Sequence, residues 1–149
     1  EELIRNYMNE QAVFARVKIH MGTPYSLNKQ VDTVLIEKPP IMAVAGIANP
    51  ERFLQTLLDN GYNVEHTHWF EDHAVYSESD IHLMCHEAKE KEVSIIAITE
   101  KDAVKLRDHG NLFHKYDIQL LVIPIQAELI QGKQQVQELL LSICSQYSV

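Results

Sequence analysis

Short apolar runs and amphipathic stretches alternate along residues 41–147. The apolar runs predict buried strands at "IMAVAG" (41–46), "YNVEHTHWF" (62–70), "VSIIAIT" (93–99) and "IQLLVIPI" (118–125). Between them, apolar residues recur every three or four positions, which predicts helices. We expect these helices at residues 50–61, 77–92, 100–110 and 132–147. This alternation predicts the fold class α/β, with a Rossmann-like, mainly parallel sheet and helices on both faces.

The first forty residues have a different pattern. "AVFARVKIHM" (12–21) alternates apolar and polar positions, and "VDTVLIEK" (31–38) is a second plausible strand. "KPP" (38–40) then interrupts pairing, because proline has no backbone N–H. We therefore predict a two-stranded linker ribbon within residues 1–40, followed by one α/β domain over residues 41–149.

Composition and charge narrow the classes of function. The chain has 149 residues, of which 46% are hydrophobic and 23% charged, as in ordinary globular proteins. A net charge of -8 argues against a broad nucleic-acid surface, which needs clustered Lys and Arg. The apolar runs are far shorter than the ~20 residues that cross a bilayer. The first residue is not Met, so we expect a piece of a longer protein.

The two cysteines, Cys85 and Cys144, lie in apolar helical patterns without CxxC spacing. We expect both to be buried hydrophobic residues, and a reducing compartment.

Three junctions carry the candidate chemistry, each where a predicted strand meets a predicted helix. They are "AGIANPERF" (45–53), "FEDHAVYSESD" (70–80) and "ITEKDAVK" (98–105). Asn49, Ser77 and Thr99 are expected N-caps, the last two with an Asp three residues later. The carboxyl ends of parallel strands form one ligand edge, where helix N-termini favour phosphates. Ordinary capping would explain many of these residues equally well.

Helix capping does not explain every polar residue at these junctions. Glu71, Asp72 and His73 are not needed by the helix that follows them. Lys101 is slightly unfavourable at a helix start, so it either pairs with Glu100 or Asp102 or faces an anion.

The histidines leave a metal site open as an alternative. His66 and His68 share one face of a strand, and His73 follows, so the three could hold zinc, although the pattern favours solvent-exposed strand histidines over a metal site. His82 and His86 lie off the apolar face of their helix, and we expect them in solvent. The chain has no G-x-x-x-x-G-K-[ST] phosphate loop and no G-x-G-x-x-G fingerprint.

The three junctions, in this order and spacing, resemble the C-terminal domain of the tetraacyldisaccharide 4'-kinase family, the lipid A 4'-kinases of Gram-negative bacteria. "VFARVKIHMGTPYSL" is similar to the linker between the two domains of that family. The resemblance implies transfer of the γ-phosphate of ATP, with Mg²⁺, to a lipid A disaccharide precursor. It also implies a separate N-terminal P-loop domain that binds most of the nucleotide, so we expect this chain to be inactive alone. The full-length protein would lie at the cytoplasmic face of the inner membrane, contacting it through the missing domain.

The resemblance also suggests roles for individual residues. The F-x-D-H-x-x-[YF] pattern of the family maps onto Phe70, Asp72, His73 and Tyr76, which makes His73 and Asp72 the expected catalytic residues, with His73 supporting an Asp base from the N-terminal domain. The expected residues of the nucleotide edge are Gly46, Asn49, Thr99, Lys101 and Asp102. No metal ligand is expected in this chain.

The chain departs from the family pattern at two positions. Glu71 replaces a common Pro, and Ala74 replaces a frequent second His. A non-catalytic Rossmann-like module that binds a nucleotide or a partner remains the alternative.

Overall fold

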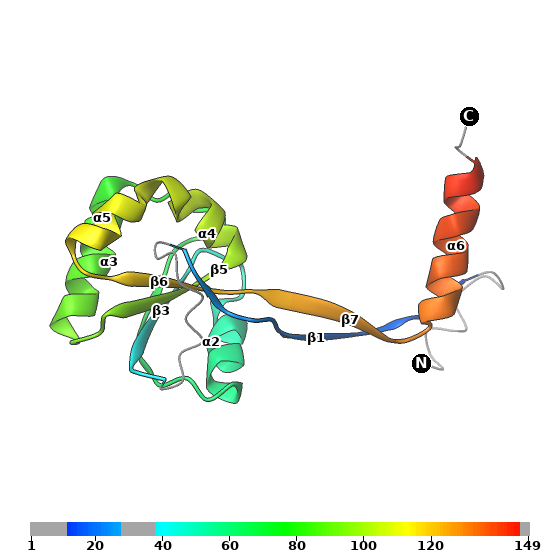
Figure 1. Ribbon diagram of the computed structural model, residues 1–149, viewed down its shortest axis with the longest axis horizontal. Helices are drawn as coiled ribbons and strands as arrows, with labels where there is room; N and C mark the ends of the chain where they lie inside the picture. Colours follow the sequence, from blue (N-terminus) through cyan, green and yellow to red (C-terminus); the bar gives the residue numbers. More distant parts are fainter. Residues whose placement is uncertain (1–11, 28–37, 147–149) are drawn as a thin grey trace. The chain divides into compact units, whose positions relative to one another are not determined.

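The computed structural model describes residues 12–27 and 38–146 (Figure 1). Its contacts divide the chain into two compact units. Met21–Ile125 forms the larger unit, and the second joins the segments at the two ends of the chain, up to His20 and from Gln126 onward.

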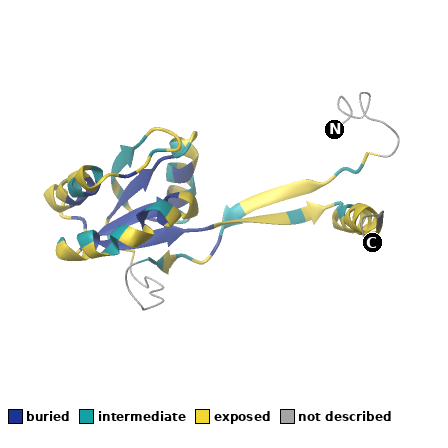
Figure 2. Cartoon of the chain, turned by 90° about the horizontal axis from the view of Figure 1, so that it is seen from above, coloured by how far each residue is buried: buried dark blue, intermediate teal, exposed yellow. Residues whose placement is uncertain are grey.

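The larger unit contains a five-stranded, mainly parallel sheet. Its strands are β2 (Tyr25–Ser26), β3 (Ile41–Ala45), β4 (Val64–Trp69), β5 (Ile95–Thr99) and β6 (Gln119–Ile123). They are ordered β2-β6-β5-β3-β4, and only the short β2 at one edge runs antiparallel to its neighbour. Every residue of β3 and β6 is buried, which explains their continuous apolar sequences (Figure 2). The predicted parallel α/β sheet is confirmed.

Helices cover both faces of this sheet, as predicted. They are α2 (Pro50–Asp59), α3 (Glu78–Glu90), α4 (Glu100–Leu106), the 3₁₀ turn η1 (Arg107–His109) and α5 (Gly110–Lys115). Helix α2 packs on one face with Ile41 and Ala43, whereas α3, α4 and α5 share the other face with Met42 and Val44. Right-handed crossovers explain this distribution, because the chain moves one way from β3 to β4 and the opposite way from β4 to β5 and β6.

The reversal in strand order creates a switch point between β3 and β5. The connection from β3 leads to its neighbour β4 on one side, and the chain then returns to β5 on the other side. Connections therefore leave the carboxyl ends of β3 and β5 toward opposite faces, which is where open α/β sheets bind ligands. The loops that follow β3, β4 and β5 are the three junctions singled out in the sequence.

The second unit is a ribbon and a helix. Strands β1 (Arg16–Met21) and β7 (Ile125–Gln131) form a two-stranded antiparallel sheet, and α6 (Lys133–Gln146) follows (Figures 1 and 2). Gly132, between β7 and α6, has φ +77°, and a Cβ there would lie 2.1 Å from the Phe14 carbonyl oxygen. Only glycine fits this corner.

Several expectations differ from the structure at these ends. Strand β1 pairs with β7, whereas its expected partner, 31–38, lies largely outside the described residues. The expected helix 132–147 forms as α6, but it groups with the ribbon and not with the sheet. Cys144, on α6, is exposed and not buried as expected, whereas Cys85 is buried as expected. The reading of residues 1–40 as an interdomain linker stays a prediction.

Two further differences concern helix ends. The expected helix 100–110 stops at Leu106, and a 3₁₀ turn follows it. Gly110 was expected to end the helix, but it takes a right-handed helical conformation and begins α5. Within the described part of the chain, no helix is both long and apolar enough to span a bilayer.

Candidate functional site

The three junctions are formed by loops with capped helices behind them. Asn49 Oδ1 accepts a hydrogen bond from the Arg52 N–H at 3.1 Å and caps α2. Ser77 and Asp80 form the complete capping box of α3. Thr99 Oγ1 accepts from the Asp102 N–H at 3.2 Å and caps α4. The predicted caps are confirmed, and they set where each loop ends.

Asp102 joins the loops after β3 and β5. Its side chain is buried, and its Oδ2 accepts hydrogen bonds from the Thr99 hydroxyl at 2.7 Å and from the Gly46 N–H at 3.2 Å. A buried carboxylate requires such donors, because water cannot solvate it. Asp102 therefore fixes the backbone of the loop after β3 at the switch point.

Lys101 joins the loops after β4 and β5. Its Nζ donates to Asp72 Oδ1 at 2.8 Å, so its partner is neither Glu100 nor Asp102, the two carboxylates considered from the sequence. This hydrogen bond is the main reason that the pKa of Asp72 lies below its ordinary value. The charge of His73 and the backbone N–H of His73 also lower the pKa of Asp72. Asp72 is thus held as a carboxylate, and the Lys101 side chain keeps 41% of its surface exposed.

His73 stands at the tip of this site. Its side chain is 80% exposed, and its Nε2 lies 3.7 Å from Asp72 Oδ2. Its backbone N–H donates to Asp72 Oδ1 at 3.0 Å, and its φ of +63° places it in the left-handed region. The turn closes with the Ala74 N–H donating to the Glu71 carbonyl at 3.0 Å. The loop therefore fixes the backbone of His73, and the exposed imidazole is accessible to a group from outside the chain.

An aromatic pair, the buried Tyr76 and the half-buried Phe70, packs beneath the loop. The Tyr76 ring packs edge-on against Phe70, with centroids 5.0 Å apart. Burial, with the nearby Asp102 charge, raises the pKa of the Tyr76 hydroxyl. A Cβ on Gly46 would lie 3.0 Å from that hydroxyl and 3.3 Å from Asp102 Oδ1. The close approach of these groups explains the glycine at position 46.

Lys105 is a residue that the sequence did not single out. Its Nζ donates to the Ala74 carbonyl at 2.7 Å, immediately after His73 in the chain. It also lies 3.9 Å from Asp102 Oδ1 and 5.6 Å from the centre of the Tyr76 ring. The only sequence signal was its place at the end of "TEKDAVK".

The structure does not assemble the alternative metal site. His66 and His68 both face Glu87, at 3.7 Å and 2.7 Å from its Oε2. Among residues 12–27 and 38–146, no group of three or more His, Cys, Asp or Glu side chains could hold a metal ion.

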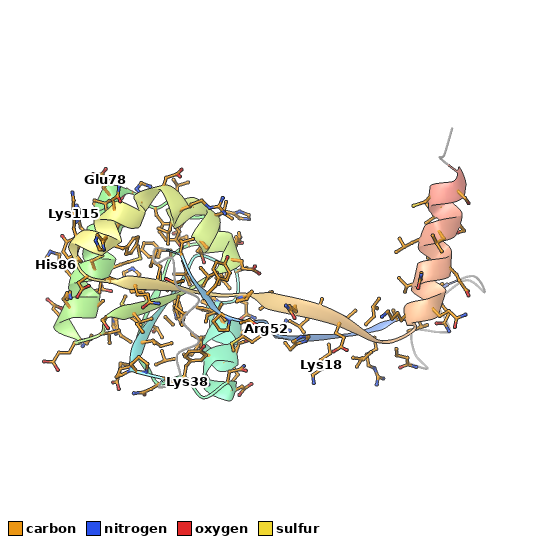
Figure 3. All side chains as sticks on the ribbon, viewed as in Figure 1. Lys18, Lys38, Arg52, Glu78, His86 and Lys115 are labelled. Atoms are coloured by element: carbon orange, nitrogen blue, oxygen red, sulfur yellow. The ribbon has the colours of Figure 1, made fainter. Side chains whose placement is uncertain are left out.

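The helical histidine pair also differs from its expectation. His86 is exposed on α3 (Figure 3), but His82 is half-buried and its Nδ1 lies 2.8 Å from the Tyr116 hydroxyl. The expectation of solvent was therefore wrong for His82.

Known proteins resemble this chain over most of its length. The family model described as tetraacyldisaccharide-1-P 4'-kinase matches residues 3–145. The tetraacyldisaccharide 4'-kinase of Shewanella halifaxensis is 48% identical over 69 residues, which cover 46% of this chain and 19% of that protein. The enzyme of Shewanella sediminis is 40% identical over 98 residues, covering 62% and 26%. The chain thus spans only about a fifth to a quarter of these curated relatives.

A solved structure supports the fold. LpxK from Aquifex aeolicus, crystallised in complex with ATP, has a TM-score of 0.55 and 16% identity, covering 87% of this chain and 36% of that one. The resemblance seen in the three junctions is confirmed by the match over residues 3–145, and the chain belongs to the tetraacyldisaccharide 4'-kinase family.

Proposed function

We propose that this chain is the C-terminal part of a kinase that transfers the γ-phosphate of ATP to the 4'-hydroxyl of a tetraacyldisaccharide 1-phosphate in lipid A biosynthesis. Family membership supports the reaction class. The observation that carries the proposal is the exposed His73 at the ligand edge of the sheet, with its backbone bonded to Asp72 and its ring 3.7 Å from the same carboxylate. A non-catalytic module would not need an exposed imidazole held in this way.

His73 would act with a carboxylate supplied by the N-terminal P-loop domain. A sugar hydroxyl is a poor nucleophile, and a base that takes its proton during attack accelerates the reaction. An imidazole beside that base would orient it and balance its charge. Asp72 would hold His73 in place from the opposite side, through the backbone bond and the ring contact described above.

The remaining edge residues would have two different roles. Gly46 and Asp102 are buried, so they would shape the loops and not touch the nucleotide. Asn49 and Thr99 cap helices. Lys101, whose side chain is 41% exposed beside its contact with Asp72, is the residue of this set suited to approach an anion. ATP would supply the phosphoryl group and Mg²⁺ would neutralise its charge, both held mainly by the N-terminal domain.

The same proposal gives the cellular setting. The full-length protein would be peripheral at the cytoplasmic face of the inner membrane and would contact it through the N-terminal domain. The lipid A disaccharide precursor would reach the site from the membrane. The isolated 149 residues would be inactive because the phosphate loop lies in the other domain.

The test uses the full-length protein that contains this chain. His73→Ala should lower kcat about 10²–10⁴-fold in transfer of labelled phosphate from ATP to the tetraacyldisaccharide 1-phosphate. His114→Ala, which removes an exposed histidine of α5, is the matched control and should leave kcat unchanged. An unchanged rate in His73→Ala would remove the assigned role. Normal activity of the isolated chain would contradict the division between two domains.

A further inference from the structure

Lys105 is a cationic side chain that is directed into the protein. Only 24% of its side chain is exposed, although a lysine on a short surface helix can keep its ammonium group in water at no cost. Instead, its Nζ donates to the Ala74 carbonyl at 2.7 Å and lies 5.6 Å from the centre of the buried Tyr76 ring. This arrangement withdraws a charge from water, so the contacts must compensate for it.

The first contact holds the turn that carries His73. This turn contains a residue at φ +63°, a conformation that costs free energy for any residue except glycine. Its internal hydrogen bond, from the Ala74 N–H to the Glu71 carbonyl, does not attach it to the rest of the fold. The bond from Lys105 to the Ala74 carbonyl attaches it directly to α4.

The second contact balances a buried charge. Asp102 Oδ2 is bonded to the Gly46 N–H and the Thr99 hydroxyl, whereas Asp102 Oδ1 makes no such bond among the described residues, and the buried Tyr76 hydroxyl is the neutral group that interacts with this carboxylate. Lys105 Nζ lies 3.9 Å from Oδ1. Removing the positive charge would leave a buried carboxylate without its nearest cation, which is strongly unfavourable.

Lys105 therefore links three parts of the ligand edge through one ammonium group. It reaches the His73 turn through Ala74, the loop after β3 through Asp102 and Gly46, and α4 through its own backbone. The more exposed pair of Lys101 and Asp72 makes a second link between the same turn and α4.

We propose that Lys105 is a positioning residue for phosphoryl transfer, which sets the place and orientation of His73 through the Ala74 carbonyl. This inference rests on the proposed function for the role of His73. Lys105 does not touch the substrate, so its loss changes the geometry of the reaction and not the binding of ATP.

The kinetic test compares three variants of the full-length protein. Lys105→Met should lower kcat about 10- to 100-fold, because a small displacement of a reacting group has an effect of this size, while KM for ATP changes less than about twofold. Lys105→Arg keeps the charge and donors and should recover much of the rate. Lys115→Met is the matched control, since Lys115 is exposed at the end of α5 (Figure 3). A folded Lys105→Met protein with the wild-type kcat would overturn the proposal.

A spectroscopic measurement separates this inference from the proposed function. The amide nitrogen of Val75 shares a peptide bond with the Ala74 carbonyl, so loss of the Lys105 bond should shift its ¹⁵N resonance and that of the His73 side chain. Protein labelled with ¹⁵N-valine and ¹⁵N-histidine gives both signals, and Lys105→Gln replaces Lys105→Met if the latter does not fold. Unchanged resonances would overturn the positioning role whatever the activity. If the resonances shift in the variant but the wild-type full-length protein has no 4'-kinase activity, the result contradicts the proposed function instead.

Discussion

The buried strands and the loops at their carboxyl ends are held by different forces. Strands β3 and β6 are buried along their whole length and contact helices through many apolar side chains. The loops after β3, β4 and β5 are held by a few polar side chains, three of them on α4: Lys101, Asp102 and Lys105. The stability of the core is therefore shared among many contacts, whereas the order of the edge depends on single bonds.

This difference predicts that substitutions in the two regions will have different consequences. A truncation in the core should lower the free energy of unfolding by several kcal/mol. A change at the edge should cost less stability but should move a loop relative to its neighbours. Substitutions in the core, at its border with the edge, and at the exposed end of the edge test this contrast.

The largest effect is expected at Phe113, a fully buried residue of α5. Phe113→Ala should lower the free energy of unfolding by about 3–5 kcal/mol, because it removes a large apolar side chain and leaves a cavity. Urea titrations followed by the fluorescence of Trp69, the chain's one tryptophan, measure this change. Leu83→Ala on α3, where Leu83 is 47% exposed, is the control and should cost much less. Equal losses at the two sites would contradict the assigned core.

The sequence predicted this core well because apolar runs and helical spacing are strong local signals. The strands β3, β5 and β6 have almost no polar residue, so their burial follows directly. Strand β7 was missed for the opposite reason. Its residues Ile125–Gln131 are mostly exposed and follow Pro124, and they pair with the distant β1. Pairing between chain ends has no local signature.

A smaller effect is expected where the core meets the edge, at Gly46. Gly46→Ala should cost about 1–3 kcal/mol, because the new methyl group would lie 3.0 Å from the Tyr76 hydroxyl. Tyr76→Phe removes that hydroxyl, so the same substitution should cost less in the Tyr76→Phe background. Urea titrations of the four proteins form a double-mutant cycle. A coupling energy of zero would show that the hydroxyl is not what excludes a side chain at position 46.

The candidate site was predictable only where its contacts are local in sequence. The caps at Ser77 and Thr99 join residues three apart, so their patterns are visible in the chain. The bonds between loops join residues much farther apart: 29 positions for Lys101 and Asp72, 31 for Lys105 and Ala74, and 56 for Gly46 and Asp102. These pairs depend on strand order, which the sequence does not reveal. For that reason the only pairing partners considered for Lys101 were Glu100 and Asp102 of its own helix, beside the alternative that it faces an anion, and Lys105 was missed.

The smallest effect is expected at the exposed end of the edge, in the ion pair of Lys101 and Asp72. The Lys101 hydrogen bond is the main cause of the lowered pKa of Asp72. A lowered folded-state pKa stabilises the protein above the unfolded value of about 3.9, and this contribution is lost as the pH falls through the folded-state pKa. Because the pair is exposed, added salt should weaken it.

Lys101→Met should therefore raise the pKa of Asp72 toward its ordinary value, and reduce the difference in stability between neutral and acidic pH. NMR titration of the side-chain carboxyl carbons measures the pKa directly. Asp80 is an internal control, because its pKa is lowered chiefly by hydrogen bonds from Ser77 and should stay low in the variant. If the pKa of Asp72 does not move, the pair does not form in solution. Of Lys101 and Lys105, only Lys105 would then attach the His73 turn to α4. The core and the edge would differ even more in the number of contacts that hold them.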